Sequence, residues 1–184
     1  SSWGANETWS GNINETSVEF NVSFPDSNGI YLWGVKACDL NNYCIDSENK
    51  TIYVDKSEPV VALVIPLNNT SVYDNTVNFN YNVSDYAIGE CNLTIGGVVN
   101  QTDSSVSVNT QETISTNLDN GNYNWSVTCL DRVGKTDTSG IWDVTVCQPS
   151  WSCTDYPTSC SSSGTRTRTC TDSNSCGTNT DKPS

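Results

Sequence analysis

Histidine and methionine are absent from this chain of 184 residues. Without histidine, one copy of the chain cannot build a Ser-His-Asp or Cys-His catalytic group or an imidazole metal site. Basic residues are also scarce, because eight Lys and Arg stand against 21 Asp and Glu and give a net charge of -13. Binding nucleic acid requires a basic surface. We therefore predict no enzyme activity, no catalytic residues, no metal site and no nucleic-acid partner.

Long apolar segments and helix-forming residues are scarce as well. The longest apolar run covers only residues 59–67, about half of the roughly 18 residues that mark a membrane span. Val and Ile together outnumber Leu by 27 to 7, and Ser, Thr and Asn supply 70 residues. These residue types favour strands and turns over helices. The composition predicts an all-β fold without a membrane span.

Cysteine is abundant, and its spacing argues for disulfides. No C-x2-C pair occurs among the nine cysteines, so a zinc site is a poor explanation for them. Disulfides form in oxidising compartments. We therefore expect an extracellular or cell-surface protein. The predicted disulfide cysteines are Cys38, Cys44, Cys91, Cys129, Cys147, Cys153, Cys160, Cys170 and Cys176.

Ten N-x-[ST] sequons fit the same location. Several of their asparagines alternate with apolar residues and are expected on the solvent face of a strand. We predict N-linked glycans, with no other cofactor. The candidate asparagines are Asn6, Asn14, Asn21, Asn49, Asn68, Asn69, Asn82, Asn92, Asn100 and Asn124.

A repeat with an offset of 92 residues organises most of the chain. Residues 28–35 match residues 120–127, and Asp39 matches Asp131. A unit of about 90 residues with alternating apolar positions has the size of a β-sandwich domain. We predict a complete sandwich over 57–146. Its seven strands are expected near 60–66, 77–83, 90–96, 97–101, 112–118, 122–130 and 141–147.

The period of two along these strands predicts the core and two disulfides. One face carries Val77, Phe79, Tyr81 and Val83, and another carries Tyr123, Trp125, Val127 and Cys129. Cys129 is expected to meet Cys91 in the core of the sandwich. Cys38 points to the other face of its strand, so Cys44 is its expected partner, across a hairpin tip.

Residues 29–39 (GIYLWGVKACD), 49–55 (NKTIYVD) and Pro59 resemble tandem immunoglobulin-like repeats of archaeal and other prokaryotic surface proteins. The resemblance covers about residues 1–147. It implies a role as a spacer, a surface-layer component, an adhesin stalk or a filament subunit.

Under this alignment residues 1–56 form only part of a sandwich, because residue 1 matches about residue 93. Three explanations are open: a fragment of a longer chain, completion by strands of a neighbouring copy, or a small rearranged fold. Completion by a neighbour would also satisfy open sheet edges. We predict a head-to-tail homopolymer, whose contact does not close on itself.

The segment 147–184 holds five cysteines and almost no aliphatic residues. Trp151-Ser152-Cys153 and residues 160–170 (CSSSGTRTRTC) resemble a thrombospondin type 1 module. The resemblance implies cation–π stacking of Arg166 and Arg168 on Trp151, and on Tyr156 as a further partner. Capture of an anionic glycan by the two arginines is the alternative. One cysteine is left over, either as a thiol or in a bridge between subunits.

Calcium is a weaker candidate, at Asp39/Asn41/Asn42 or at Asp26/Asn28, where side-chain oxygens cluster. Stabilisation of turns by these residues is the favoured interpretation.

The predicted function is a structural subunit of a glycosylated extracellular filament or surface layer, whose partners are copies of itself. The alternative is a stalk or binding module of an adhesin that contacts surface glycans or proteins through Trp3, Trp9 and Trp142. The competing interpretation of these residues is that Trp3 and Trp9 cover the partial sandwich and that Trp142 packs on a neighbouring domain.

Overall fold

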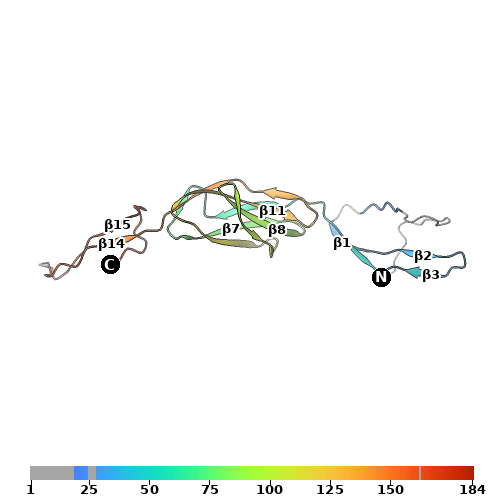
Figure 1. Cartoon of the computed structure of the whole chain (residues 1–184), viewed down its shortest axis with the longest axis horizontal. Helices are drawn as coiled ribbons and strands as arrows, with labels where there is room; N and C mark the ends of the chain where they lie inside the picture. The colour runs from blue at the N-terminus through green and yellow to red at the C-terminus, as the bar shows by residue number, and fades with distance from the viewer. Residues whose placement is uncertain (1–18, 25–27, 162) are drawn as a thin grey trace. The chain divides into compact units, whose positions relative to one another are not determined.

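The computed structural model describes residues 19–24, 28–161 and 163–184, and the fold is all-β, as the sequence predicts. Over these ranges no helix is long and apolar enough to cross a membrane. The chain divides into two compact units, Ser1–Lys56 and Ser57–Ser184 (Figure 1). Each unit is described by itself below.

The N-terminal unit contains two short antiparallel ribbons in its described part. Strand β1 (Gly29–Trp33) pairs with β4 (Lys50–Val54), and β2 (Lys36–Cys38) pairs with β3 (Cys44–Asp46). Each ribbon has only two strands. Neither can enclose a core, because a two-stranded sheet needs a third strand or a packed layer for independent stability.

The second unit contains a β-sandwich of two sheets. Strands β10, β7 and β5 form one sheet, and β6, β13, β11, β8 and β9 form the other, with β12 paired to β11. The strands are β5 (Val60–Ile65), β6 (Thr70–Val72), β7 (Thr76–Ser84), β8 (Ile88–Ile95), β9 (Val98–Asp103), β10 (Gln111–Asn117), β11 (Gly121–Asp131), β12 (Thr136–Thr138) and β13 (Trp142–Val146).

All seven strands expected from the sequence are present, with bounds that agree within two residues. Strands β6 and β12 are not predicted by the sequence pattern. Each has three residues, TSV and TDT, which is too short for an alternating pattern to be recognised.

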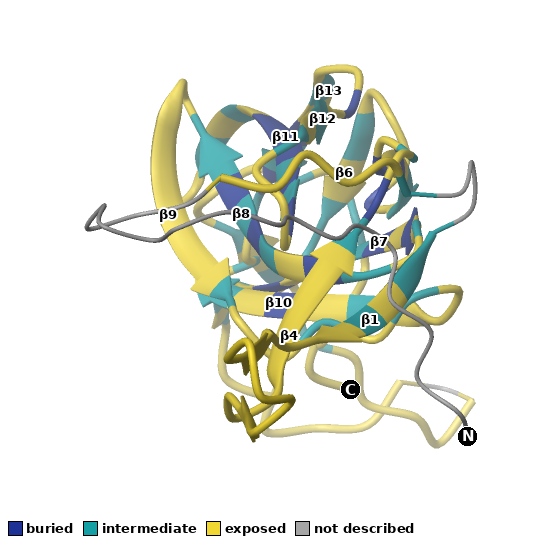
Figure 2. Cartoon of the chain, turned by 90° about the vertical axis from the view of Figure 1, so that its right-hand side faces the viewer, coloured by how far each residue is buried: buried dark blue, intermediate teal, exposed yellow. Residues whose placement is uncertain are grey.

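The core lies between the two sheets of the sandwich, where both predicted apolar faces meet. Phe79, Tyr81 and Val127 are fully buried, and the Phe79 and Trp125 rings pack edge to face at 4.8 Å. Buried residues follow β7, β8 and β11 (Figure 2). Burial, together with the charge of Asp103, raises the pKa of Tyr81 above its usual value, and the Tyr81 hydroxyl donates to the Asp103 carboxylate at 3.2 Å.

The 92-residue repeat is present in the strand register. Gly29 pairs with Val54 in β1 and β4, and Gly121 pairs with Val146 in β11 and β13, so the same positions pair in both units. The ribbon of β2 and β3 matches the pairing of β11 with β12 in the same way.

Side-chain hydrogen bonds in the turns repeat at the same offset. Asp39 Oδ1 accepts bonds from the backbone N–H groups two and four residues further on, and Asp131 Oδ1 does the same. The Ser47 and Ser139 hydroxyls each accept the backbone N–H of the residue twelve positions earlier. The N-terminal unit therefore repeats the β11–β12–β13 part of the sandwich down to individual hydrogen bonds.

Residues after the sandwich form a third ribbon, in which β14 (Trp151–Cys153) pairs with β15 (Cys170–Asp172). Asp172 organises its loop by accepting the backbone N–H groups of Ser150, Asn174 and Cys176. Partial desolvation acts to raise the pKa of Asp172, but these backbone hydrogen bonds outweigh it and hold the pKa below its usual value.

Candidate functional site

The repeat shows which side chains of the N-terminal unit occupy core positions. Trp33 corresponds to Trp125, and Val35 corresponds to Val127. In the sandwich these two side chains are 1% and 0% exposed, whereas Trp33 and Val35 are 49% and 44% exposed. The same residue types in the same local structure are thus buried in one unit and open to solvent in the other.

The edge of the N-terminal ribbon is open as well. In the sandwich, β8 lies beside β11 and places Leu93 opposite Val127 and Cys91 opposite Cys129. Over the described part of the N-terminal unit, no strand pairs with the corresponding edge of β1 and β2. An unpaired edge next to apolar side chains is a template for another strand.

The other face of the N-terminal ribbon is also apolar. Its Ile30 and Leu32 are 57% and 52% exposed. At the corresponding positions the sandwich carries Asn122 and Asn124, which face solvent. Polar residues are expected on a sheet face that stays in solvent. Exposed Ile and Leu side chains on the corresponding face of the ribbon indicate that another layer packs on this face as well. We use the name open ribbon for the strand pair β1 and β4 together with Val35, which follows β1, and for the two apolar faces of this pair.

Four disulfides bridge the chain. The structure joins Cys38 to Cys44 and Cys91 to Cys129, the two pairs that the strand pattern predicts. The core bridge spans 38 residues and the hairpin bridge spans six. The core bridge therefore removes more freedom from the unfolded chain.

The C-terminal segment carries the other two bridges, Cys147–Cys176 and Cys153–Cys170. Cys160 is exposed and is left as a thiol. The sequence alone could not assign these pairs, because five cysteines with similar spacings allow many arrangements.

The predicted cation–π stacking is present only in part. The Arg168 guanidinium lies 5.0 Å from the centre of the Tyr156 ring, but the cation over Trp151 is Lys182, at 5.4 Å. Arg166 instead donates to Cys160 Sγ at 3.5 Å. The prediction that both arginines stack on Trp151 is wrong, because residues 165–169 do not form the regular strand that would align alternate side chains.

The other aromatic candidates differ in position. Trp142 is half-buried and packs edge to face on Trp125 at 6.0 Å, so it contributes to the sandwich and is not an open binding residue. Trp3 and Trp9 lie outside the described residues.

Seven of the predicted glycosylation asparagines are exposed in the structure. They are Asn21, Asn49, Asn68, Asn69, Asn82, Asn100 and Asn124. Asn92 is half-buried, and its side chain bonds to Thr102 and Glu90. Asn6 and Asn14 lie outside the described residues. Most described sequons are therefore accessible to modification.

The oxygens considered for calcium in the N-terminal unit are used in local structure. Asp39 accepts backbone N–H groups in its turn, and Asn28 Oδ1 accepts the Lys56 N–H at 2.7 Å. Asp26 lies outside the described residues. These contacts agree with the interpretation that the side chains stabilise turns.

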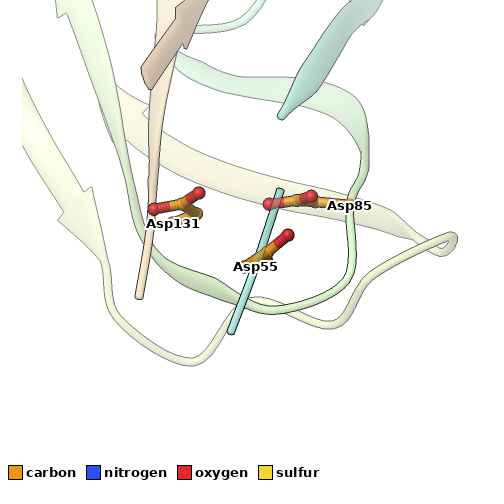
Figure 3. Close-up of side chains that lie close together, drawn as sticks. All are labelled: Asp55, Asp85 and Asp131. Atoms are coloured by element: carbon orange, nitrogen blue, oxygen red, sulfur yellow. The ribbon is translucent and has the colours of Figure 1, made fainter. Parts of the chain in front are cut away.

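A carboxylate pair in the sandwich was not predicted. Asp85, after β7, and Asp131, at the end of β11, each have a carboxylate oxygen within 4.8 Å of the other (Figure 3). Figure 3 also draws Asp55, which belongs to the N-terminal unit. The sequence showed Asp131 as a repeat position, but nothing in it linked this residue to Asp85.

No protein-family profile matches the chain, and no curated protein matches it. Among solved structures, the chain is similar to the Clostridium thermocellum CbhA fibronectin(III)-like modules, with 17% sequence identity and a TM-score of 0.42. The match covers 48% of this chain and 96% of the other chain.

Proposed function

We propose that this chain is a structural subunit of a glycosylated extracellular filament or surface layer, assembled head to tail by strand complementation between copies. The observation that carries the proposal is the open ribbon. Its Trp33 and Val35 have the local structure of core residues, yet they are 49% and 44% exposed.

The sandwich shows what would cover the open ribbon, which has no such cover among residues 19–24 and 28–56. In the sandwich, β8 pairs with the edge of β11, and the β10–β7–β5 sheet packs on its inner face. The open ribbon needs the same two elements, a strand at its edge and an apolar layer on its face. Strand addition supplies backbone hydrogen bonds along the edge, and alternate side chains fill the face.

We assign these elements to a second copy of the chain. The open ribbon has the strand register of β11 and β13, so a strand of a neighbouring copy that pairs with its edge can take the spacing that β8 takes along β11. Ile30 and Leu32 make the outer face apolar as well, so a neighbour that covers both faces would bury more apolar surface than a simple edge contact. A contact between two different surfaces is heterologous, and repetition of such a contact produces a fibre.

The four disulfides support an extracellular location, because such bridges persist in oxidising compartments. In the C-terminal segment, two bridges and the two cation–π pairs take the place of an apolar core. We interpret this segment as a thrombospondin type 1-like module that stiffens the subunit.

Two sequons on neighbouring strands of the sandwich are expected to differ in glycan occupancy. Asn124 on β11 is exposed, whereas Asn92 on β8 has its amide nitrogen near Glu90 and its oxygen bonded to Thr102. We expect glycopeptide mass spectrometry of the protein from its native source to find sugar on Asn124 and little or none on Asn92. Modification of Asn92 with an unmodified Asn124 would contradict this assignment.

Negative-stain electron microscopy of the purified chain tests the proposed function. We expect regular fibres or sheets whose amount increases with protein concentration. Isolated, evenly sized particles at every concentration would contradict the proposal and favour the stalk or binding module of an adhesin. Light scattering on the same samples distinguishes ordered growth from amorphous aggregation.

A further inference from the structure

We propose that the sandwich binds a divalent cation, Ca²⁺, through the carboxylates of Asp85 and Asp131. This site goes beyond the proposed assembly and does not depend on it. The pair lies at the end of the sandwich where β7 and β11 finish, and the close-up shows the two carboxylates facing each other (Figure 3).

Each of the two carboxylates buries one oxygen atom. Asp131 is only 2% exposed, and its Oδ2 atom has no hydrogen-bond partner among the residues that the structure describes. Asp85 Oδ2 is also buried, and no described residue forms a hydrogen bond with it. Two carboxylates within 4.8 Å repel each other, and an unsatisfied buried oxygen is unfavourable. A cation between them removes both penalties.

The repeat supplies an internal comparison. Asp39 forms the same turn as Asp131 and accepts the same two backbone N–H groups, but its side chain is exposed. The turn therefore uses one carboxylate oxygen and does not require the other to be buried. The buried Oδ2 of Asp131 needs a separate explanation, and a bound cation provides it.

The donor atoms select the type of cation. Both side chains offer carboxylate oxygens, the ligands that Ca²⁺ prefers. The Ser57 hydroxyl donates to Asp85 Oδ1 at 2.5 Å, and Lys135 Nζ bonds to the Ser57 carbonyl at 2.8 Å. These two bonds hold Ser57, the first residue of the unit, beside Asp85 and beside Lys135, which lies in the turn that Asp131 begins. Ca²⁺ accepts irregular oxygen ligands and water, whereas Mg²⁺ demands an octahedral site.

Calorimetric titration of the full chain with CaCl₂ tests the site. We expect saturable binding with a Kd of about 0.1 to 1 mM, the range of extracellular Ca²⁺ modules. Asp85→Asn and Asp131→Asn should each weaken binding at least tenfold. Asp119→Asn removes an equal charge at an exposed position and should leave the Kd unchanged.

Thermal unfolding in chelator and in 10 mM CaCl₂ provides a second readout. Ca²⁺ should raise the Tm of the wild type by about 3 °C or more, while Mg²⁺ has a smaller effect. In chelator the Asn variants should be at least as stable as the wild type, because the carboxylate repulsion is gone. Absence of saturable binding, unchanged affinity in both Asn variants, or equal Ca²⁺ and Mg²⁺ effects in every variant would overturn the proposal.

Discussion

Val35→Asp is expected to abolish the assembly of this protein while the subunit stays folded. Val35 corresponds to the fully buried Val127 but is 44% exposed in its own unit. In the isolated subunit the new carboxylate therefore stays in contact with solvent, and the substitution should change the stability of the fold little. In the assembly a strand and a layer would bury the new carboxylate without a partner, which costs roughly 3 to 5 kcal/mol. Association should weaken by at least about a hundredfold.

Light scattering over a range of concentrations measures this effect, and circular dichroism checks the fold. Leu40→Asp is the matched control, because Leu40 is fully exposed at the tip between β2 and β3. It introduces the same charge outside the open ribbon and should assemble like the wild type. Assembly of the Val35→Asp variant at wild-type concentrations would contradict the role of the open ribbon.

The double variant Cys91→Ala/Cys129→Ala is expected to lose about 4 kcal/mol of the unfolding free energy of the sandwich. Both cysteines are fully buried, and their bridge spans 38 residues. In the chain-entropy model, a loop of that length accounts for about 4 kcal/mol. Small domains have only about 5 to 15 kcal/mol of stability in total. Urea unfolding followed by Trp fluorescence, with Trp125 in the core, measures the loss.

Cys38→Ala/Cys44→Ala is the matched control for the disulfide prediction. Its bridge spans six residues and belongs to the other unit. The expected loss is about 2 kcal/mol, confined to the N-terminal unit. The sandwich transition should stay at its wild-type midpoint. A core variant that loses less than about 1 kcal/mol would show that packing alone maintains the sandwich.

The sandwich could be predicted from sequence because its strands are long and regular. Val77, Phe79, Tyr81 and Val83 alternate with polar residues along β7, and the structure buries all four. The offset of 92 residues led to the correct strand equivalences because both copies of the hairpin keep the same turn residues, such as Asp39 and Asp131. The alternation of apolar and polar residues along a strand and the 92-residue repeat can both be recognised in a single sequence.

Other features depend on distant contacts and left no such signal. Lys182 reaches Trp151 from the end of the chain, and Asp85 meets Asp131 across two loops. Neither pair has a fixed spacing. Arg166 and Arg168 looked like a stacked pair because they alternate, but their segment is not a strand, so the alternation had no structural meaning there.

A map of the assembled protein at side-chain resolution, obtained by electron microscopy, tests the central claim most directly. The account predicts that a strand of a neighbouring copy pairs with the β1–β2 edge and that Trp33 and Val35 are buried beneath that neighbour. A map in which copies meet through other surfaces, with Trp33 and Val35 still open to solvent or covered by the same polypeptide, would contradict it.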